Sequence, residues 1–138
     1  MRKQLQWSDF FLVVGLMLGS CNPISAQHND MLIRISEIEI YADSLHAYKA
    51  ILKEEAEASV RLEPGVISIF PMYQQKDTTQ VRILEIYKNR EAYESHLKTS
   101  HFQRYKTSTK AMVKALRLID MDAIDPATMN GIFSKLHH

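Results

Sequence analysis

Hydrophobic residues recur along the chain with two different periods, which together predict a series of strands and helices. Residues 32–41 are rich in isoleucine and largely alternate with polar residues, as a half-buried strand does. Residues 45–62 instead place apolar side chains three or four positions apart, the period of an amphipathic helix. The same criteria predict strands over residues 66–75, 80–88 and 115–121, helices over 90–97 and 101–114, and a short helical turn opened by Asp125-Pro126 before Gly131.

The order of these elements predicts the fold class. One strand and one helix are followed by two strands, two short helices and a fourth strand, which reads as two β-α-β halves. Such an order is typical of an α+β, ferredoxin-like antiparallel sheet with its helices on one face. No sequence repeat relates the two halves.

The predicted strands are apolar on both sides, which bears on assembly. An antiparallel sheet with one wet face shows apolar and polar residues in alternation. In the second strand, strict alternation places Val66, Phe70 and Met72 on one face and Ile67, Ile69 and Tyr73 on the other. In the fourth strand, Leu116 and Leu118 lie on one face and Ile119 and Met121 on the other. The face without helices must therefore also be covered, and in so short a chain a second copy is the simplest cover. We expect a homodimer formed sheet on sheet, and we expect a charge at Leu118 or at an outward-facing neighbour to disrupt it.

Titratable and aromatic side chains concentrate between residues 85 and 101, across a predicted strand-to-helix junction. Alternation places Glu85 on the same strand face as Tyr87. Asn89 is a suitable N-cap for a short helix that brings Tyr93 and His96 to one side, three residues apart. A second helix is predicted to restart at Ser100 with a capping box completed by Gln103, close to His101. We therefore look for chemistry in this stretch.

Each of these side chains has a functional and a structural interpretation. His96 is the best candidate general base, because its ordinary pKa of about 6.5 leaves it largely neutral, but it could equally be a packing residue. Glu85 could orient a base or substrate, or it could form a salt bridge or cap that holds strand to helix. Tyr87 and Tyr93 could bind an aromatic ligand or complete the core, and His101 could bind ligand or serve as a cap.

Other functional classes lack their usual sequence features. We expect no metal site, because His96 and His101 are five residues apart with a break between their helices. No glycine-rich phosphate loop, Ser-His-Asp arrangement or CxxC motif is present. The balance of charges, 15 basic and 15 acidic residues after residue 20, does not suggest a nucleic-acid-binding protein.

The first thirty residues predict export. Arg2-Lys3 precedes an apolar run at residues 10–18 that is too short to span a bilayer but suits a signal peptide. Leu18-Gly19-Ser20-Cys21 resembles a bacterial lipobox, so we expect a signal peptide over 1–20, lipidation at Cys21, a tether over 21–30 and one domain over 31–138. The alternative is simple secretion with cleavage after Ala26. Either way we expect an exported protein, in the cell envelope through a lipid anchor or in the periplasm.

The central stretch resembles a known family. Its pattern E-I-Y-x5-Y-x2-H-L-x3-H-F, from Glu85 to Phe102, is similar to the signature of the antibiotic-biosynthesis monooxygenase (ABM) superfamily, which includes quinol monooxygenases. Glu63-Pro-Gly-Val66 is similar to the family element that opens the second strand. The resemblance covers roughly residues 32 to 121 and implies a dimeric α+β barrel.

The resemblance also implies an activity. The protein would use no flavin, haem or metal, and would act with O2 on a small aromatic or quinol in an apolar pocket. His96 would form the phenolate, while Glu85, Tyr87 and Tyr93 would hold it. Many active relatives have tryptophan at the position of Tyr87. Haem-degrading relatives use a tryptophan and a first-strand asparagine, whereas here the single tryptophan, Trp7, lies in the expected signal peptide and the first strand has no asparagine, which disfavours haem degradation. The alternative function is a non-catalytic, envelope-tethered dimer that binds a small apolar ligand or a partner protein.

Overall fold

The computed structural model describes residues 30–136. The expected signal peptide, Cys21 and residues 22–29 of the tether lie outside this range. The described chain forms, in order, β1 (Leu32–Ile40), a 3-10 turn η1 (Ala42–Ser44), α1 (Leu45–Leu62), β2 (Val66–Tyr73), β3 (Gln80–Tyr87), α2 (Arg90–His96), α3 (Ser100–Thr109), β4 (Val113–Met121) and α4 (Thr128–Lys135).

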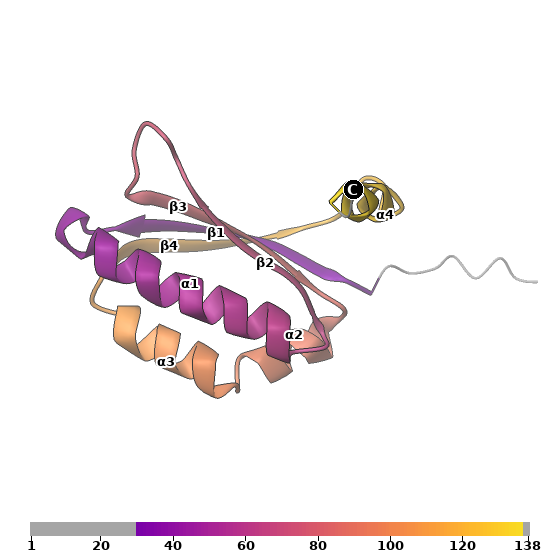
Figure 1. The fold of residues 1–138 in the computed structure, drawn as a ribbon, viewed down its shortest axis with the longest axis horizontal. Helices are drawn as coiled ribbons and strands as arrows, with labels where there is room; N and C mark the ends of the chain where they lie inside the picture. The colour runs from indigo at the N-terminus through magenta and orange to yellow at the C-terminus, as the bar shows by residue number, and fades with distance from the viewer. Residues whose placement is uncertain (1–29, 137–138) are drawn as a thin grey trace, which may run out of the picture.

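The four strands form one antiparallel sheet in the order β2-β3-β1-β4. The helices α1 and α3 lie side by side on one face of this sheet, and α2 lies at one end of the same layer (Figure 1). α4 stands apart from that layer, beyond the end of β4 (Figure 1). The predicted α+β, ferredoxin-like fold is therefore confirmed. No helix in residues 30–136 has the length and apolar character needed to cross a bilayer.

The core lies between the sheet and α1. In β1 every second residue is buried, and Leu32, Ile38 and Ile40 on that face join the core. From α1 the buried apolar residues are Tyr48, Leu52 and Ala56. These residues follow the predicted periods. Val60 follows the same spacing on α1, yet its side chain is 48% exposed.

Two polar residues of β1 share the buried face with these core residues. Arg34 and Ser36 lie between Leu32 and Ile38 and are 8% and 2% exposed. On α1 the buried stripe likewise includes Glu55 and Ser59. Each of these polar groups needs a partner, because burying an unpaired polar or charged group is costly.

Three local details differ from the sequence prediction. The α3 helix ends at Thr109 rather than near residue 114, since a turn closed by Met112 N–H on the Thr109 carbonyl leads directly into β4. Its N-cap is Thr99, whose side chain accepts from the Phe102 N–H, and Ser100 is the first helical residue. α4 continues through Gly131 rather than stopping before it.

A register shift at the start of β2 changes the side to which one residue points. Between Val66 and Ser68 the pairing with β3 is irregular. Val66 therefore joins the core beside Ile69, whereas strict alternation would have placed Val66 with Phe70 on the opposite face.

The position of α2 depends on a close approach at Gly65. A Cβ atom on Gly65 would lie 2.5 Å from the Cβ of Ala92. The helix is capped as predicted, since the Asn89 side chain accepts a hydrogen bond of 2.8 Å from the Ala92 N–H. The Lys88 N–H also donates to the Gly65 carbonyl, so the turn after α1 and the start of α2 are held together.

The sheet face opposite α1 and α3 is rich in apolar residues. We call it the open face, and from the pairing register its apolar members are Ile33, Ile35, Phe70, Met72, Leu84, Ile86, Ile119 and Met121. Phe70 and Met121 are 58% and 47% exposed. Leu118 pairs with Ser36 and so lies on the helix side, and among its neighbours Ile119 is the outward-facing one.

Candidate functional site

A cavity of about 580 Å³ lies between the sheet and the helices α2 and α3. Four of the residues that the sequence singled out line it: Glu85, Tyr87, Tyr93 and His96. The strand β3 supplies the first two, and the short helix after Asn89 supplies the other two. We call this space the sheet–helix cavity. Its volume is within the range of about 300–1,000 Å³ that is usual for small-molecule sites.

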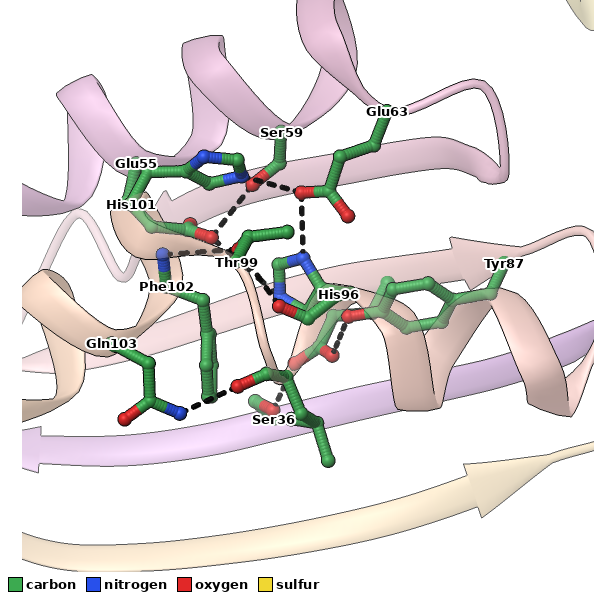
Figure 2. A network of polar contacts seen from close by, with 12 residues as sticks. Ser36, Glu55, Ser59, Glu63, Tyr87, His96, Thr99, His101, Phe102 and Gln103 are labelled. Atoms are coloured by element: carbon green, nitrogen blue, oxygen red, sulfur yellow. Dashed lines mark hydrogen bonds and ion pairs between the residues drawn. The ribbon is translucent and has the colours of Figure 1, made fainter.

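Glu85 is held in the cavity wall by two hydroxyl donors. Its Oε1 accepts a hydrogen bond from Ser36 Oγ, and its Oε2 accepts one of 2.8 Å from the Tyr87 hydroxyl (Figure 2 shows Ser36 and Tyr87). Tyr87 is fully buried, and this burial, together with the nearby carboxylate, raises the pKa of its phenol well above the ordinary value. The phenol therefore stays protonated and acts as a donor, so it fixes the orientation of Glu85.

His96 is buried and touches an acid from the turn after α1. Its Nδ1 lies 3.0 Å from Glu63 Oε1, and His101 Nε2 lies 2.5 Å from the same oxygen (Figure 2). An ionised Glu63 can only accept hydrogen bonds, so in this arrangement His96 Nδ1 and His101 Nε2 each carry a proton and act as donors. In a neutral His96 ring the other nitrogen, Nε2, is then a proton acceptor.

A second buried acid faces that acceptor nitrogen. Glu55 Oε1 lies 3.6 Å from His96 Nε2 and accepts a hydrogen bond of 2.7 Å from Ser59 Oγ. Burial raises the pKa of Glu55, and the Ser59 hydrogen bond opposes that rise. The His96 ring thus lies between the carboxyl groups of Glu63 and Glu55.

Two aromatic rings, those of Tyr87 and Phe102, pack against the His96 ring in the cavity wall. The His96 ring centroid lies 5.4 Å from that of Tyr87 and 4.7 Å from that of Phe102. The Tyr87 ring in turn meets Tyr93 edge-on at 5.3 Å. Deeper in the helix layer the hydroxyls of Tyr48 and Tyr105 form a hydrogen bond of 2.8 Å, and burial raises the pKa of Tyr105 to about 12. These contacts leave the His96 ring little freedom to reorient.

Glu63, His96 and His101 also have the composition of a metal-ligand set. One donor atom of each lies within 4.8 Å of the others. The spacing argument against a metal site considered only the two histidines and did not foresee that Glu63 lies between them. Here the carboxylate joins the two imidazoles directly, so the three groups satisfy one another as hydrogen-bond partners.

The structure separates one predicted site residue from the other four. His101 lines a different groove of about 420 Å³ between α1 and α3, together with Glu54 and Arg104. It meets the site through its hydrogen bond to Glu63 and through its ring, whose centroid lies 6.4 Å from that of His96. His101 is therefore placed to position Glu63 rather than to contact a ligand in the sheet–helix cavity.

Sequence reasoning missed four polar residues that build the site: Arg34, Ser36, Glu55 and Glu63. Three of them carried a usable signal, since each falls on a stripe of its element that is otherwise apolar. Glu63 carried no such signal. It lies at the end of α1, and only the turn through Gly65 brings it against α2.

Comparisons with known proteins agree with this architecture. The sequence profile of the family Antibiotic biosynthesis monooxygenase matches residues 31–108. The crystal structure of a protein described as a putative antibiotic biosynthesis monooxygenase, from Bacteroides thetaiotaomicron, is similar with a TM-score of 0.70 and 43% identity, covering 70% of this chain and 92% of that one. One from Nitrosomonas europaea has a TM-score of 0.66 at 21% identity, covering 71% of this chain and 94% of that one, and so supports the fold alone. No curated protein matches the chain. The profile match and the Bacteroides structure together show that the chain belongs to the antibiotic biosynthesis monooxygenase family.

Proposed function

We propose that this protein is a cofactor-independent monooxygenase that acts with O2 on a small aromatic or quinol in the sheet–helix cavity. The observation that carries the proposal is the convergence of Glu85, Tyr87, Tyr93 and His96 on one cavity of suitable volume. A proton acceptor, two phenols and a fixed carboxylate are the groups needed to bind a phenol and ionise it. Family membership supports the same reaction class.

In the proposed reaction His96 accepts the phenolic proton at Nε2. The resulting imidazolium would be stabilised by Glu63 at Nδ1 and by Glu55 beside Nε2, at 3.0 and 3.6 Å. A positioned general base of this kind contributes about 10²- to 10⁴-fold to the rate. Glu85, held by Ser36 and Tyr87, would accept a hydrogen bond from a second hydroxyl of the substrate and so orient the ring.

The phenolate is the electron donor in this scheme. Transfer of electrons from its ring to O2 and formation of one carbon–oxygen bond give a ring hydroperoxide. Cleavage of the O–O bond with loss of water leaves a quinone carbonyl, so a phenol and O2 become a quinone and water. One oxygen atom enters the product and the other leaves as water, with the substrate supplying the reducing electrons. Enclosure in the cavity would exclude water from the anion.

Dissolved-oxygen consumption by the purified protein across a panel of quinols tests this proposal. At least one quinol should be consumed faster with protein than without, and His96→Ala should lower that turnover about 10²- to 10⁴-fold. If His96 is instead a packing residue, the substitution should mainly lower the melting temperature and leave turnover per folded molecule unchanged. No acceleration with any quinol would overturn the proposal and leave a ligand-binding module.

A further inference from the structure

A buried arginine, Arg34, forms part of the wall of the sheet–helix cavity. Arg34 lies on the helix side of β1, is 8% exposed and lines the cavity. Its guanidinium carbon lies 4.7 Å from the centre of the Tyr93 ring. Its Nε donates a hydrogen bond of 2.7 Å to a single oxygen of Asp120 on the neighbouring strand β4. The Asp120 hydrogen bond raises the pKa of Arg34 further above its ordinary value, so the group stays charged.

Arg34 pairs with a protein carboxylate through only one of its nitrogen atoms. A guanidinium presents five N–H donors in a planar fork that can grip a carboxylate with two parallel hydrogen bonds. Asp120 engages one of these donors, and within residues 30–136 no other carboxylate lies within 4.0 Å of the guanidinium. In that range the two terminal amino groups therefore have no second carboxylate partner, and the Tyr93 side chain is the other hydrogen-bonding group that raises the pKa of Arg34.

The other charged groups of the cavity wall favour an anion as well. Lys106 of α3 and Lys110, the C-cap of that helix, line it, and in the described part of the chain neither lies within 4.0 Å of a carboxylate. The two acids in the wall are already served by protein donors. Glu85 accepts from Ser36 and Tyr87, and Glu55 accepts from Ser59. The cavity wall thus carries three cations, Arg34, Lys106 and Lys110, against two acids, and the two lysines have no acidic partner among the described residues.

We propose that the sheet–helix cavity is specific for an aromatic compound that carries a carboxylate. The carboxylate would bind the terminal amino groups of Arg34, and the ring would lie between Tyr93 and the exposed leucines Leu116 and Leu118. Lys106 and Lys110 would attract the anion at the mouth of the cavity. This substrate class rests on the proposed function, but the binding that it predicts does not require turnover.

Calorimetric titration with two matched probes tests the proposal. Naphthalene-2-carboxylate and naphthalene-2-carboxamide have nearly the same shape, and neither has a phenol that could be oxidised. The wild-type protein should bind the carboxylate about 10-fold or more tightly than the carboxamide, as a charge-assisted pair does. Arg34→Gln should remove this preference while leaving the carboxamide affinity unchanged. Equal wild-type affinities, or loss of both probes together in a folded Arg34→Gln protein, would overturn it.

A second variant keeps the proposal testable if Arg34→Gln does not fold. Asp120, whose side chain is 59% exposed, places a negative charge beside the guanidinium to which the ligand carboxylate would bind, and so would repel the ligand. Asp120→Asn should therefore tighten carboxylate binding about two- to five-fold, the range expected for an exposed ion pair, and leave the affinity for the carboxamide unchanged. Unchanged or weaker carboxylate binding would contradict the proposal. Arg117→Gln is the matched control, because Arg117 lies on the open face paired with Glu37 and should change neither affinity.

These outcomes separate the substrate class from the reaction. Preferential binding of the carboxylate without oxygen consumption by any quinol would retain this inference and overturn the proposed function. Oxygen consumption with neutral quinols alone, together with equal affinity for the two probes, would retain the proposed function and overturn this inference.

Discussion

The candidate site combines buried acids with donors that come from several elements. Glu85 is served by Ser36 and Tyr87, and Glu55 is served by Ser59 with His96 nearby. Within residues 30–136 no buried side-chain nitrogen or oxygen lacks a hydrogen-bond partner. Such satisfied networks hold their members in fixed orientations, because breaking one bond leaves a buried group unpaired. His96 is therefore presented to the cavity in a fixed orientation.

Because burial raises the pKa of Glu55, we expect the free energy of unfolding to depend on pH. Its pKa in the folded protein is raised above the ordinary value of 4.5 by burial, with Ser59, His96, His101 and Glu63 around it. An acid with a raised pKa binds its proton more tightly when folded. The stability that it contributes below about 4.5 is therefore lost as the pH rises through its folded pKa.

Glu55→Gln removes this titration while keeping the shape of the side chain. We expect the free energy of unfolding of the wild type to fall relative to that of Glu55→Gln as the pH rises from 4 to 7. Urea unfolding of both proteins across that range measures the difference. Glu57→Gln, a change at an exposed acid of the same helix, is the control and should follow the wild type. A constant difference between wild type and Glu55→Gln would show that Glu55 titrates normally.

At the residue scale the sequence identified part of the site. Alternation on β3 correctly placed Glu85 and Tyr87 on the buried side, and helical spacing correctly brought Tyr93 and His96 together. Arg34 and Glu55 could have been found as charges on apolar stripes. The Glu63–His96 contact could not be predicted, because it joins residues 33 positions apart that are separated along the chain by β2 and β3.

The element that brings the site together is the short helix α2. It carries Tyr93 and His96, and it reaches its place through the close approach of Ala92 to Gly65. Seven residues are too few for a helix to be stable alone, so its stability comes from its cap and its packing. A substitution at Gly65 should therefore displace α2 and with it the Tyr93 and His96 side chains in the cavity.

Gly65→Ala tests this packing. The added methyl would meet the Ala92 side chain at 2.5 Å, so we expect a loss of about 1–3 kcal/mol in unfolding free energy. Ala92→Gly removes the opposing methyl, and the double variant should lose less than the sum of the two single losses. A double-mutant cycle by chemical denaturation measures the coupling. Strictly additive losses would mean that the two positions do not touch.

Element existence was predictable, while some boundaries were not. The periods of β1 and α1 are long and regular, and both elements were placed correctly. The passage from α3 to β4 was predicted too late, because apolar residues such as Met112 and Val113 suit either a helix or a strand. Tertiary pairing decides the matter: Val113 pairs with Ile40 at an irregular step in the β1–β4 ladder.

At the scale of the whole molecule, the open face of the sheet is the feature that the monomer does not explain. Phe70 and Met121 are about half exposed on a face that also carries Ile35, Leu84 and Ile119. Contiguous apolar patches on soluble proteins mark interaction sites. We propose that a second copy covers this face, as the doubly apolar strands suggested. The exported, lipid-anchored location expected from Cys21 concerns residues 1–29 and stays a prediction.

Phe70→Glu should disrupt this assembly. A carboxylate within an apolar interface would be buried without a partner, which strongly disfavours association. Light scattering at micromolar protein concentration should give the mass of two chains for the wild type and of one chain for Phe70→Glu. Val60→Glu is the matched control, because Val60 is similarly exposed but belongs to α1, away from the open face, and should leave the mass unchanged. A wild-type mass of one chain would contradict the proposed dimer.

The most direct test of the account is the fate of the oxygen atoms. The purified protein is supplied with a quinol that it consumes under 18O2, and the product is analysed by mass spectrometry after a short reaction. The proposed monooxygenase reaction predicts one 18O atom on a ring carbon of the product and one in water, with the labelled product falling about 10²- to 10⁴-fold in His96→Ala. Product without label, formed while O2 is reduced to peroxide, would contradict oxygen insertion in this cavity.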